Sequence, residues 1–577
     1  MLRGASLLRL RVGFLLIAMI VSIFAVRLFE LQGVDAKAYV AKARAEGVVT
    51  VDLPATRGSI VDRNGVPLAD SVDGLMIVAD PSLTAAHASG IATIVARRLH
   101  LDYFDVLGRL RKPKTNFQYI ARRVPATEAR AIVAAIDAKG YQGIDTRRDP
   151  VRSYPGDDVA ANLVGFMNEE GQAAEGSELM FDTTLAGRNG RATYEVGGGN
   201  RIPLGDNSTV PARRGHDVRL TIDRDVQWYS QRALRDAVQS VNGDSGSTVV
   251  MDTHTGELLA LADYPSLDAN NPSKSPDSDL ASRALRDAYE PGSVEKVLTI
   301  SSLIDAGKIT PRTKVVVPPT ITSNDRVIHD DVTHGTLHLT MTGVLAKSSN
   351  IGTALAARHL SSQRLYDYLH RFGLGRRTEL GVNGESAGVL SDPATWMQIN
   401  HDNIAFGQGV AVNAVQMAAA VNAVANDGVY VSPSLIKGRA TTSGGQVVGS
   451  ETSTRRRVVS AAAAAQTRRM MESVTQEGVT APNTAIAGYR LAGKTGTAQR
   501  VGTKCRCYDG THTVSFVGVA PADHPRFLVY TVVQNPRNGG FGSTTAGPVV
   551  HAVMSYLLQK YAVPPDGTPS PKPSLTW

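Results

Sequence analysis

Three short strings, far apart in the sequence, hold the residue types that acyl transfer through a serine requires. The first is Ser293-Val294-Glu295-Lys296, the second is Ser348-Ser349-Asn350, and the third is Lys494-Thr495-Gly496-Thr497. Each string alone is common by chance. Together they supply a hydroxyl nucleophile, an amine base, a proton relay and a cation that can hold a carboxylate. This combination predicts a catalytic site built from three distant parts of the chain.

The first string offers the nucleophile and its base. Pro291-Gly292 ends the preceding structure, and the apolar spacing after it predicts a helix over Val294–Ala306. Lys296 then lies on the same face as Ser293, with about 5–6 Å between the two Cβ atoms. Burial and the positive end of the helix dipole both disfavour a charged amine, so a neutral Lys296 could remove the proton of Ser293. The alternative for this string alone is a capped helix with an incidental lysine.

The second string offers a proton relay. Ser348 and Asn350 precede or open another predicted helix. The Ser348 hydroxyl could pass a proton between Lys296 and a leaving amine, while the Asn350 amide could hold Lys296 and bind a peptide bond of the substrate. Taken alone, the string has the residue types of an ordinary helix cap.

The third string offers a place for an extended, negatively charged substrate. It follows a short apolar stretch and predicts a strand edge that a peptide could lie along. Lys494, Thr495 and Thr497 could bind a terminal carboxylate, and Gly496 would allow close approach. The backbone N–H groups of Ser293 and Thr497 are candidates for the oxyanion hole.

Two other patterns indicate different chemistry and fit less well. Gly488–Thr495 matches the phosphate-binding pattern G-x-x-x-x-G-K-T, but that loop must open a helix, whereas a strand is expected here. His329, Asp330, Asp331 and His334 lack the spacing of a helical zinc site and indicate a polar loop. We therefore expect no metal and no cofactor.

The N-terminal region predicts a single membrane anchor. An apolar run begins at Val12 and extends past Arg27 to Phe29, and Arg11 and Arg27 can snorkel to the two interfaces. The arginines before the run favour a cytoplasmic N-terminus. The alternative is a cleaved signal peptide, but Ala36-Lys37-Ala38 lies too far beyond the run to be a good cleavage site.

Composition narrows the class of protein further. A chain of 577 residues is too long for one core, and a net charge of +8 could favour membrane surfaces or acidic wall polymers. No basic run interleaved with aromatic residues indicates a nucleic-acid partner. The two cysteines, Cys505 and Cys507, cannot form a disulfide framework, and both an unpaired state and a strained bridge remain open.

Strand patterns at both ends of the second half predict one antiparallel sheet with a helical layer against it. Residues 247–252 pair with 257–263, and 513–520 pair with 527–533, while helical patterns lie between the two pairs. Nearer the N-terminus, Asp62-Arg63-Asn64-Gly65 predicts the tight turn of a hairpin.

With these motifs in place, the chain resembles a class B penicillin-binding protein, most closely the FtsI-type division transpeptidases. The likeness runs from the anchor to about residue 561 and includes Arg57–Gly65, Gly215–Asp223 and Phe406-Gly407-Gln408-Gly409. It implies an α+β chain with a single transmembrane helix, an elongated mixed α/β pedestal of the dimerisation type, and a transpeptidase domain whose central antiparallel sheet is flanked by helices. We divide the chain into a cytoplasmic tail (1–11), the anchor (12–29), the pedestal (30–240), the transpeptidase domain (241–562) and a disordered tail (563–577).

The resemblance implies a D,D-transpeptidase. Ser293 would attack the penultimate D-Ala carbonyl of a peptidoglycan stem peptide ending in D-Ala-D-Ala, with Lys296, Ser348 and Asn350 as the other catalytic residues. β-Lactams would acylate the same serine. The family implies a separate membrane glycosyltransferase of the FtsW type and other division proteins as partners. It also implies a single-pass protein with its catalytic domain outside the cytoplasm, at the division septum.

Several alternatives stay open at this point. One is an elongation-type transpeptidase of the same class, one is a D,D-carboxypeptidase, and one is a non-catalytic penicillin sensor or division scaffold. Glu295 departs from the pattern, because relatives often carry an apolar or aromatic residue there. We expect it to alter the cleft floor and to oppose deprotonation of Lys296.

Overall fold

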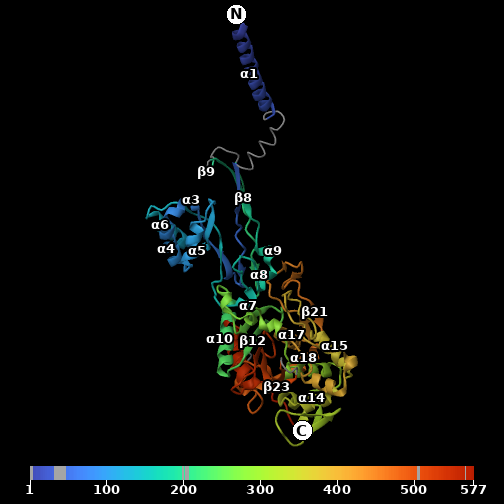
Figure 1. Ribbon diagram of the computed structural model, residues 1–577. Helices are drawn as coiled ribbons and strands as arrows, with labels where there is room; N and C mark the ends of the chain where they lie inside the picture. The colour runs from blue at the N-terminus through green and yellow to red at the C-terminus, as the bar shows by residue number, and fades with distance from the viewer. Residues whose placement is uncertain (1–3, 31–46, 198–199, 202–206, 503–506, 566) are drawn as a thin grey trace. The chain divides into compact units, whose positions relative to one another are not determined.

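The computed structural model describes two compact units, each assembled from separate segments of the chain (Figure 1). The described residues are 4–30, 47–197, 200–201, 207–502, 507–565 and 567–577. The first unit takes residues up to 56 together with 73–150 and 187–214, and the second takes 57–72, 151–186 and 215–577. Cys505 lies outside the described residues.

Helix α1, Gly4–Phe29, opens the described chain. Its part from Leu8 to Phe29 is long and apolar enough to cross a membrane, and its side chains are exposed. The helix begins before the predicted anchor, because the short polar and basic stretch ahead of Val12 continues the same helical turns.

The first unit contains two sheets. In one, β8 (Gly190–Gly197) pairs antiparallel with β1 (Val48–Leu53), β9 (Asn200–Arg201) and β10 (Ser208–Val210). In the other, β4 (Gly74–Ala79) lies between β5 (Gln118–Pro125) and β6 (Ile144–Arg148). Helices α4 (Ala88–Leu99), α5 (Tyr103–Leu110) and α6 (Ala126–Asp137) share a buried core with this second sheet.

The predicted Asp62–Gly65 hairpin is present in the second unit. β2 (Ile60–Val61) and β3 (Pro67–Val72) pair antiparallel, and β11 (Val218–Arg219) and β7 (Val151–Ser153) complete the sheet. Asp62 closes the turn, because its carboxylate accepts hydrogen bonds from the N–H groups of Asn64 at 2.7 Å and Val66 at 2.8 Å.

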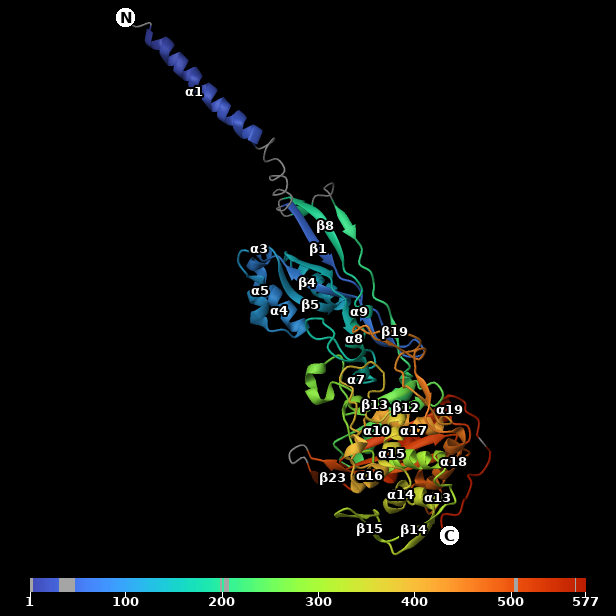
Figure 2. The same ribbon diagram turned by 90° about the vertical axis from the view of Figure 1, so that its right-hand side faces the viewer.

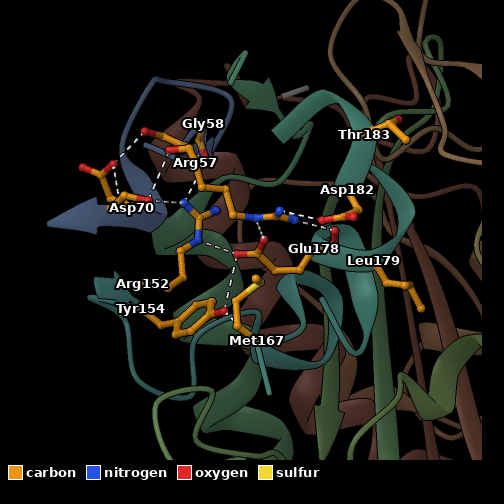
Figure 3. Close-up of polar contacts among 12 residues, drawn as sticks. Arg57, Gly58, Asp70, Arg152, Tyr154, Met167, Glu178, Leu179, Asp182 and Thr183 are labelled. Carbon is orange, nitrogen blue, oxygen red and sulfur yellow. Dashed lines mark hydrogen bonds and ion pairs between the residues drawn. The ribbon is translucent and has the colours of Figure 1, made fainter. Parts of the chain in front are cut away.

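A buried ion-pair cluster fixes this sheet to the short helices α8 (Gly176–Met180) and α9 (Asp182–Leu185) (Figure 3). Arg57 donates to Glu178 and to Asp182, each at 2.6 Å, and Arg152 donates to Glu178 at 2.6 Å. Glu178 is fully buried. Burial and then the charge of Glu178 raise the pKa of the neighbouring Tyr154, so its hydroxyl stays protonated as a donor to this carboxylate.

The predicted central sheet is present in the second unit and has the order β13-β12-β24-β23-β22. Figure 2 labels its strands β12, β13 and β23. The strands span β12 Ser245–Asp252, β13 Leu258–Tyr264, β22 Ala492–Val501, β23 Tyr508–Ala520 and β24 Phe527–Gln534, and all pairs are antiparallel. Successive residues of β12 alternate between two cores. One core contains α10 (Arg224–Ser240) and α19 (Gly547–Lys560), and the other contains α12 (Lys296–Asp305), α17 (Ala414–Ala425) and α18 (Ala461–Glu472).

Two sequence-based boundaries differ from the structure. Helix α10 packs on β13 and belongs to the second unit, so the pedestal does not reach residue 240. The prediction of a disordered tail over 563–577 is wrong for its described part, because Thr576 forms a β-bridge with Leu339 and Trp577 donates to the His338 carbonyl at 3.2 Å. The prediction relied on the Pro- and Ser-rich composition and gave no weight to the apolar residues Leu575 and Trp577, which lie at this contact.

Candidate active site

The three strings of the sequence analysis meet at one cleft of the second unit. Ser293 lies in a 3₁₀ turn, η5 (Gly292–Val294), directly before α12. Ser348 lies between α13 (Met341–Ala346) and α14 (Asn350–Ala357), and Lys494 lies in β22. The cleft has a volume of about 1080 Å³, and its lining residues include Ser293, Ser348, Asn350, Thr495 and Thr497.

The turn that carries Ser293 depends on a glycine. Gly292 has φ +55°, in the left-handed region, and a Cβ atom there would lie 2.5 Å from the Thr497 carbonyl oxygen. The Gly292 N–H donates to the Gly407 carbonyl at 3.0 Å, so the turn is held on both sides. This close approach presses the Ser293 backbone against β22, with the serine side chain in the cleft wall.

Lys296 is fully buried and points at the second string. Its Nζ donates to the Ser348 carbonyl at 2.6 Å and to Asn350 Oδ1 at 2.7 Å. Burial lowers its pKa to about 8, against the opposing charges of Asp331, Asp330 and Glu295. No hydrogen bond joins Lys296 to Ser293 within the described part of the chain, and such bonds often tighten only when substrate is bound.

The Ser348 hydroxyl lies between two amines. Lys494 Nζ donates to Ser348 Oγ at 2.8 Å, and Lys296 Nζ approaches the same oxygen at 3.4 Å. Ser348 has φ +61°, an uncommon backbone conformation for a serine that recurs at functional sites. Burial lowers the pKa of Lys494 well below its usual value, and the charge of Lys296 lowers it further. Two buried amines therefore lie close to one hydroxyl, and a charge on Lys296 disfavours a charge on Lys494.

The predicted polar loop around Asp330 positions the second string by hydrogen bonds. Asp330 accepts from the Ser349 hydroxyl at 2.7 Å and from the Ile351 N–H at 2.9 Å, so it fixes the first turn of α14. His334 contacts the same carboxylate at 3.0 Å. Sequence reasoning missed this role, because the loop and the helix are brought together only by the fold.

Strand β22 is the last strand of its sheet, so its outer edge is available to an extended peptide. Gly496 is required there, because a Cβ atom would lie 2.3 Å from the Ser515 hydroxyl. The prediction of a strand rather than a phosphate-binding loop is confirmed, since Lys494 pairs with Val517 of β23 and begins no helix.

Glu290 is a second feature that the sequence did not reveal. Its carboxylate accepts from the Gly409 N–H at 2.9 Å and from the Tyr508 hydroxyl at 3.1 Å. Tyr508 lines the cleft at the start of β23. The acid therefore ties the Phe406–Gly409 turn and the cleft rim to the segment directly before Ser293.

Glu295 differs from the expectation in its position. Its side chain is fully buried, does not line the cleft, and accepts from the Thr299 hydroxyl at 2.8 Å. Burial raises its pKa well above the usual value, which favours the neutral acid. Negative charge on Glu295 raises the pKa of Lys296, in the direction expected from the sequence, and burial of Glu295 disfavours that charge.

Comparisons with known proteins show what the chain resembles in sequence and in fold. Residues 246–555 match the penicillin binding protein transpeptidase domain, and residues 52–220 match the penicillin-binding protein dimerisation domain. The chain is 35% identical to penicillin-binding protein PbpB of Mycobacterium tuberculosis over 99% of its own length and 87% of the relative's. It is 33% identical to peptidoglycan D,D-transpeptidase FtsI of Escherichia coli, over 89% and 84%. The crystal structure of penicillin binding protein 3 from Mycobacterium tuberculosis complexed with ampicillin superimposes with a TM-score of 0.70 at 30% identity, covering 91% of this chain and 100% of that one.

Proposed function

This chain belongs to the class B penicillin-binding proteins, and we propose that it cross-links peptidoglycan stem peptides as a D,D-transpeptidase through an acyl-enzyme on Ser293. The observation that carries the proposal is the Ser348 hydroxyl, held between Lys494 at 2.8 Å and Lys296 at 3.4 Å beside the Ser293 turn. Such an arrangement can move a proton from one side of a reacting carbonyl to the other.

Acylation begins when neutral Lys296 removes the proton from Ser293 Oγ, which attacks the penultimate D-Ala carbonyl. The N–H groups of Ser293 and Thr497 stabilise the negative charge that develops on the carbonyl oxygen. The C–N bond then breaks, and the proton reaches the leaving D-Ala amine through Ser348. An amine of a second stem peptide repeats these steps in reverse and releases the cross-linked product. If water attacked the acyl-enzyme in place of that amine, the enzyme would act as a carboxypeptidase.

The substrate's terminal carboxylate would bind at Lys494, Thr495 and Thr497. Burial and the charge of Lys296 both lower the pKa of Lys494, so the Lys494 amine binds its proton weakly before a carboxylate arrives. An arriving carboxylate would favour the charged amine again. β-Lactams carry a similar carboxylate next to a reactive amide and would acylate Ser293 in the same orientation.

The cellular setting is part of the same proposal. Helix α1 would anchor the protein with its N-terminus in the cytoplasm and its catalytic domain outside. The D,D-transpeptidase FtsI is among its relatives, which favours work at the septum beside a glycosyltransferase of the FtsW type. A fluorescent fusion that stained the side wall evenly through division would contradict the septal role.

The decisive experiment is mass spectrometry of the intact protein after penicillin treatment. We expect one adduct, located on the peptide that contains Ser293, and no adduct in Ser293→Ala. Ser543→Ala is the matched control, because this serine lines the same cleft. Labelling that survives Ser293→Ala would overturn the proposal, and products made only by hydrolysis in the presence of an acceptor amine would indicate the carboxypeptidase.

A further inference from the structure

The segment 567–577, which we call the C-terminal strap, contacts two parts of the chain that lead to the active-site cleft: the approach to β22 and the start of α13. Its end lies beside β14 (Lys314–Val317) and α13 in Figure 2. Its start contacts the residues that lead into β22. We propose that the strap is a positioning element that holds Ser348 and Lys494 in register for acylation of Ser293. The inference rests on the proposed function of these residues.

At one end the strap contacts the approach to β22. Arg490 contacts the Thr568 hydroxyl at 3.5 Å, and Gln476 donates to the Pro571 carbonyl at 2.5 Å. Just before Gln476, Thr475 donates to the Leu491 carbonyl at 3.0 Å, directly before the strand that carries Lys494. This end of the strap therefore braces the wall that carries the third string.

At the other end the strap caps the wall that carries the second string. Thr340, the N-cap residue of α13, donates its N–H to the Leu575 carbonyl at 3.0 Å and its hydroxyl to the Ser574 carbonyl at 2.8 Å. Gly343 packs so closely that a Cβ atom would lie 1.9 Å from the Leu575 carbonyl oxygen. The strap therefore fixes the position of the first turn of α13.

Trp577 anchors this contact. Its indole N–H donates to the Leu339 carbonyl at 3.1 Å, its ring lies 4.8 Å from the His338 ring, and Lys314 Nζ lies 4.7 Å from its centroid. Thr576 adds a β-bridge to Leu339 of β17 (Leu337–Thr340). Trp577 is 47% exposed, and these contacts fix its other face to the paired strands β14 and β17.

A short helix carries this constraint to the reacting groups. The Lys347 N–H donates to the Gly343 carbonyl at 2.9 Å, and the Ser349 N–H donates to the Val344 carbonyl at 3.0 Å. Movement of the first turn of α13 therefore moves Ser348, whose carbonyl is 2.6 Å from Lys296 Nζ and whose hydroxyl is 2.8 Å from Lys494 Nζ. Displacements of about 1 Å in such positions can slow a reaction by about a hundredfold.

The test compares the full chain with a form that ends at residue 566. The readout is the first-order acylation rate at saturating fluorescent penicillin, measured from pH 6 to 9.5. We expect the shortened form to acylate roughly tenfold more slowly. Its pH midpoint should lie higher, because a loosened Ser348 turn admits water to Lys296. A synthetic peptide of residues 567–577, added in trans, should restore most of the rate in a saturable manner.

Point variants keep the test decisive if the shortened form fails to fold. Trp577→Ala should lower the acylation rate and raise the pH midpoint, whereas Lys572→Ala, an exposed position on the same segment, should leave both unchanged. The inference is overturned if the shortened form and Trp577→Ala both acylate at the full-length rate with the full-length midpoint. It is also overturned if the melting temperatures of both forms fall, the midpoint of the acylation pH profile does not shift, and the peptide does not restore the acylation rate. Ser293→Ala in the full chain separates this failure from failure of the proposed function, because only the latter predicts residual labelling there.

Discussion

The pH dependence of acylation follows directly from the burial of Lys296. Its pKa is lowered to about 8 from an ordinary 10.5, because the charged amine loses its water in the protein interior. If neutral Lys296 is the base, about one molecule in eleven is active at pH 7 and about half at pH 8. The first-order acylation rate should therefore rise about fivefold between these pH values and less than twofold beyond pH 8.

The assay is stopped-flow acylation by a fluorescent penicillin at saturating concentration. Saturation separates the chemical step from binding of the drug carboxylate, which we propose depends on the protonation of Lys494. A lysine with its ordinary pKa would give a rate that rises about tenfold per pH unit through pH 9 without a plateau. That result, or a rate independent of pH from 6 to 9, would refute the assignment of a buried neutral lysine as base.

Three further predictions address two residues of the site and one residue of the buried ion-pair cluster. Lys494→Ala should raise the penicillin concentration needed for half-saturation much more than it slows the chemical step. Equal saturation curves for variant and parent would contradict the carboxylate role. Glu295→Gln should leave the midpoint of the acylation pH profile in place, because burial already favours the neutral acid, whereas a clear fall in the midpoint would show that Glu295 is ionised beside Lys296. Glu178→Gln should lower the free energy of unfolding by about 3–5 kcal/mol, because it leaves two buried arginines without their shared carboxylate. Asp182→Asn, which removes a 44% exposed partner of the same Arg57, should cost about 0–1 kcal/mol, and denaturant unfolding of both variants checks the contrast.

Much of the site could be predicted from the sequence, because each string carries its chemistry in a few adjacent residues. The proximity of Ser293 to Lys296 follows from helical spacing, and the strand at Lys494 follows from the glycines that interrupt any helix. The relay geometry could not be predicted in this way. It requires Ser348 to meet side chains 52 and 146 positions away, and no local pattern encodes such a distance.

The misses have the same physical origin. Composition predicts disorder for the strap, since Pro and Ser residues form no regular pattern, but Thr576 and Trp577 contact Leu339, more than 200 positions away in the sequence. Glu295 was expected in the cleft because its neighbours in sequence are there. The 3₁₀ turn at Gly292–Val294 shifts the start of α12 to Lys296, and the carboxylate is buried instead.

The order of strands in the central sheet also constrains how the protein is made. Strand β12 pairs along its whole length with β24, so that Ser245 lies opposite Gln534. Until β24 has been synthesised, β12 and β13 form a lone hairpin with an unpaired edge, which is marginally stable and prone to mispairing. Contacts between such distant segments also slow folding. A chain stalled before residue 527 would therefore be the species most exposed to mispairing of β12.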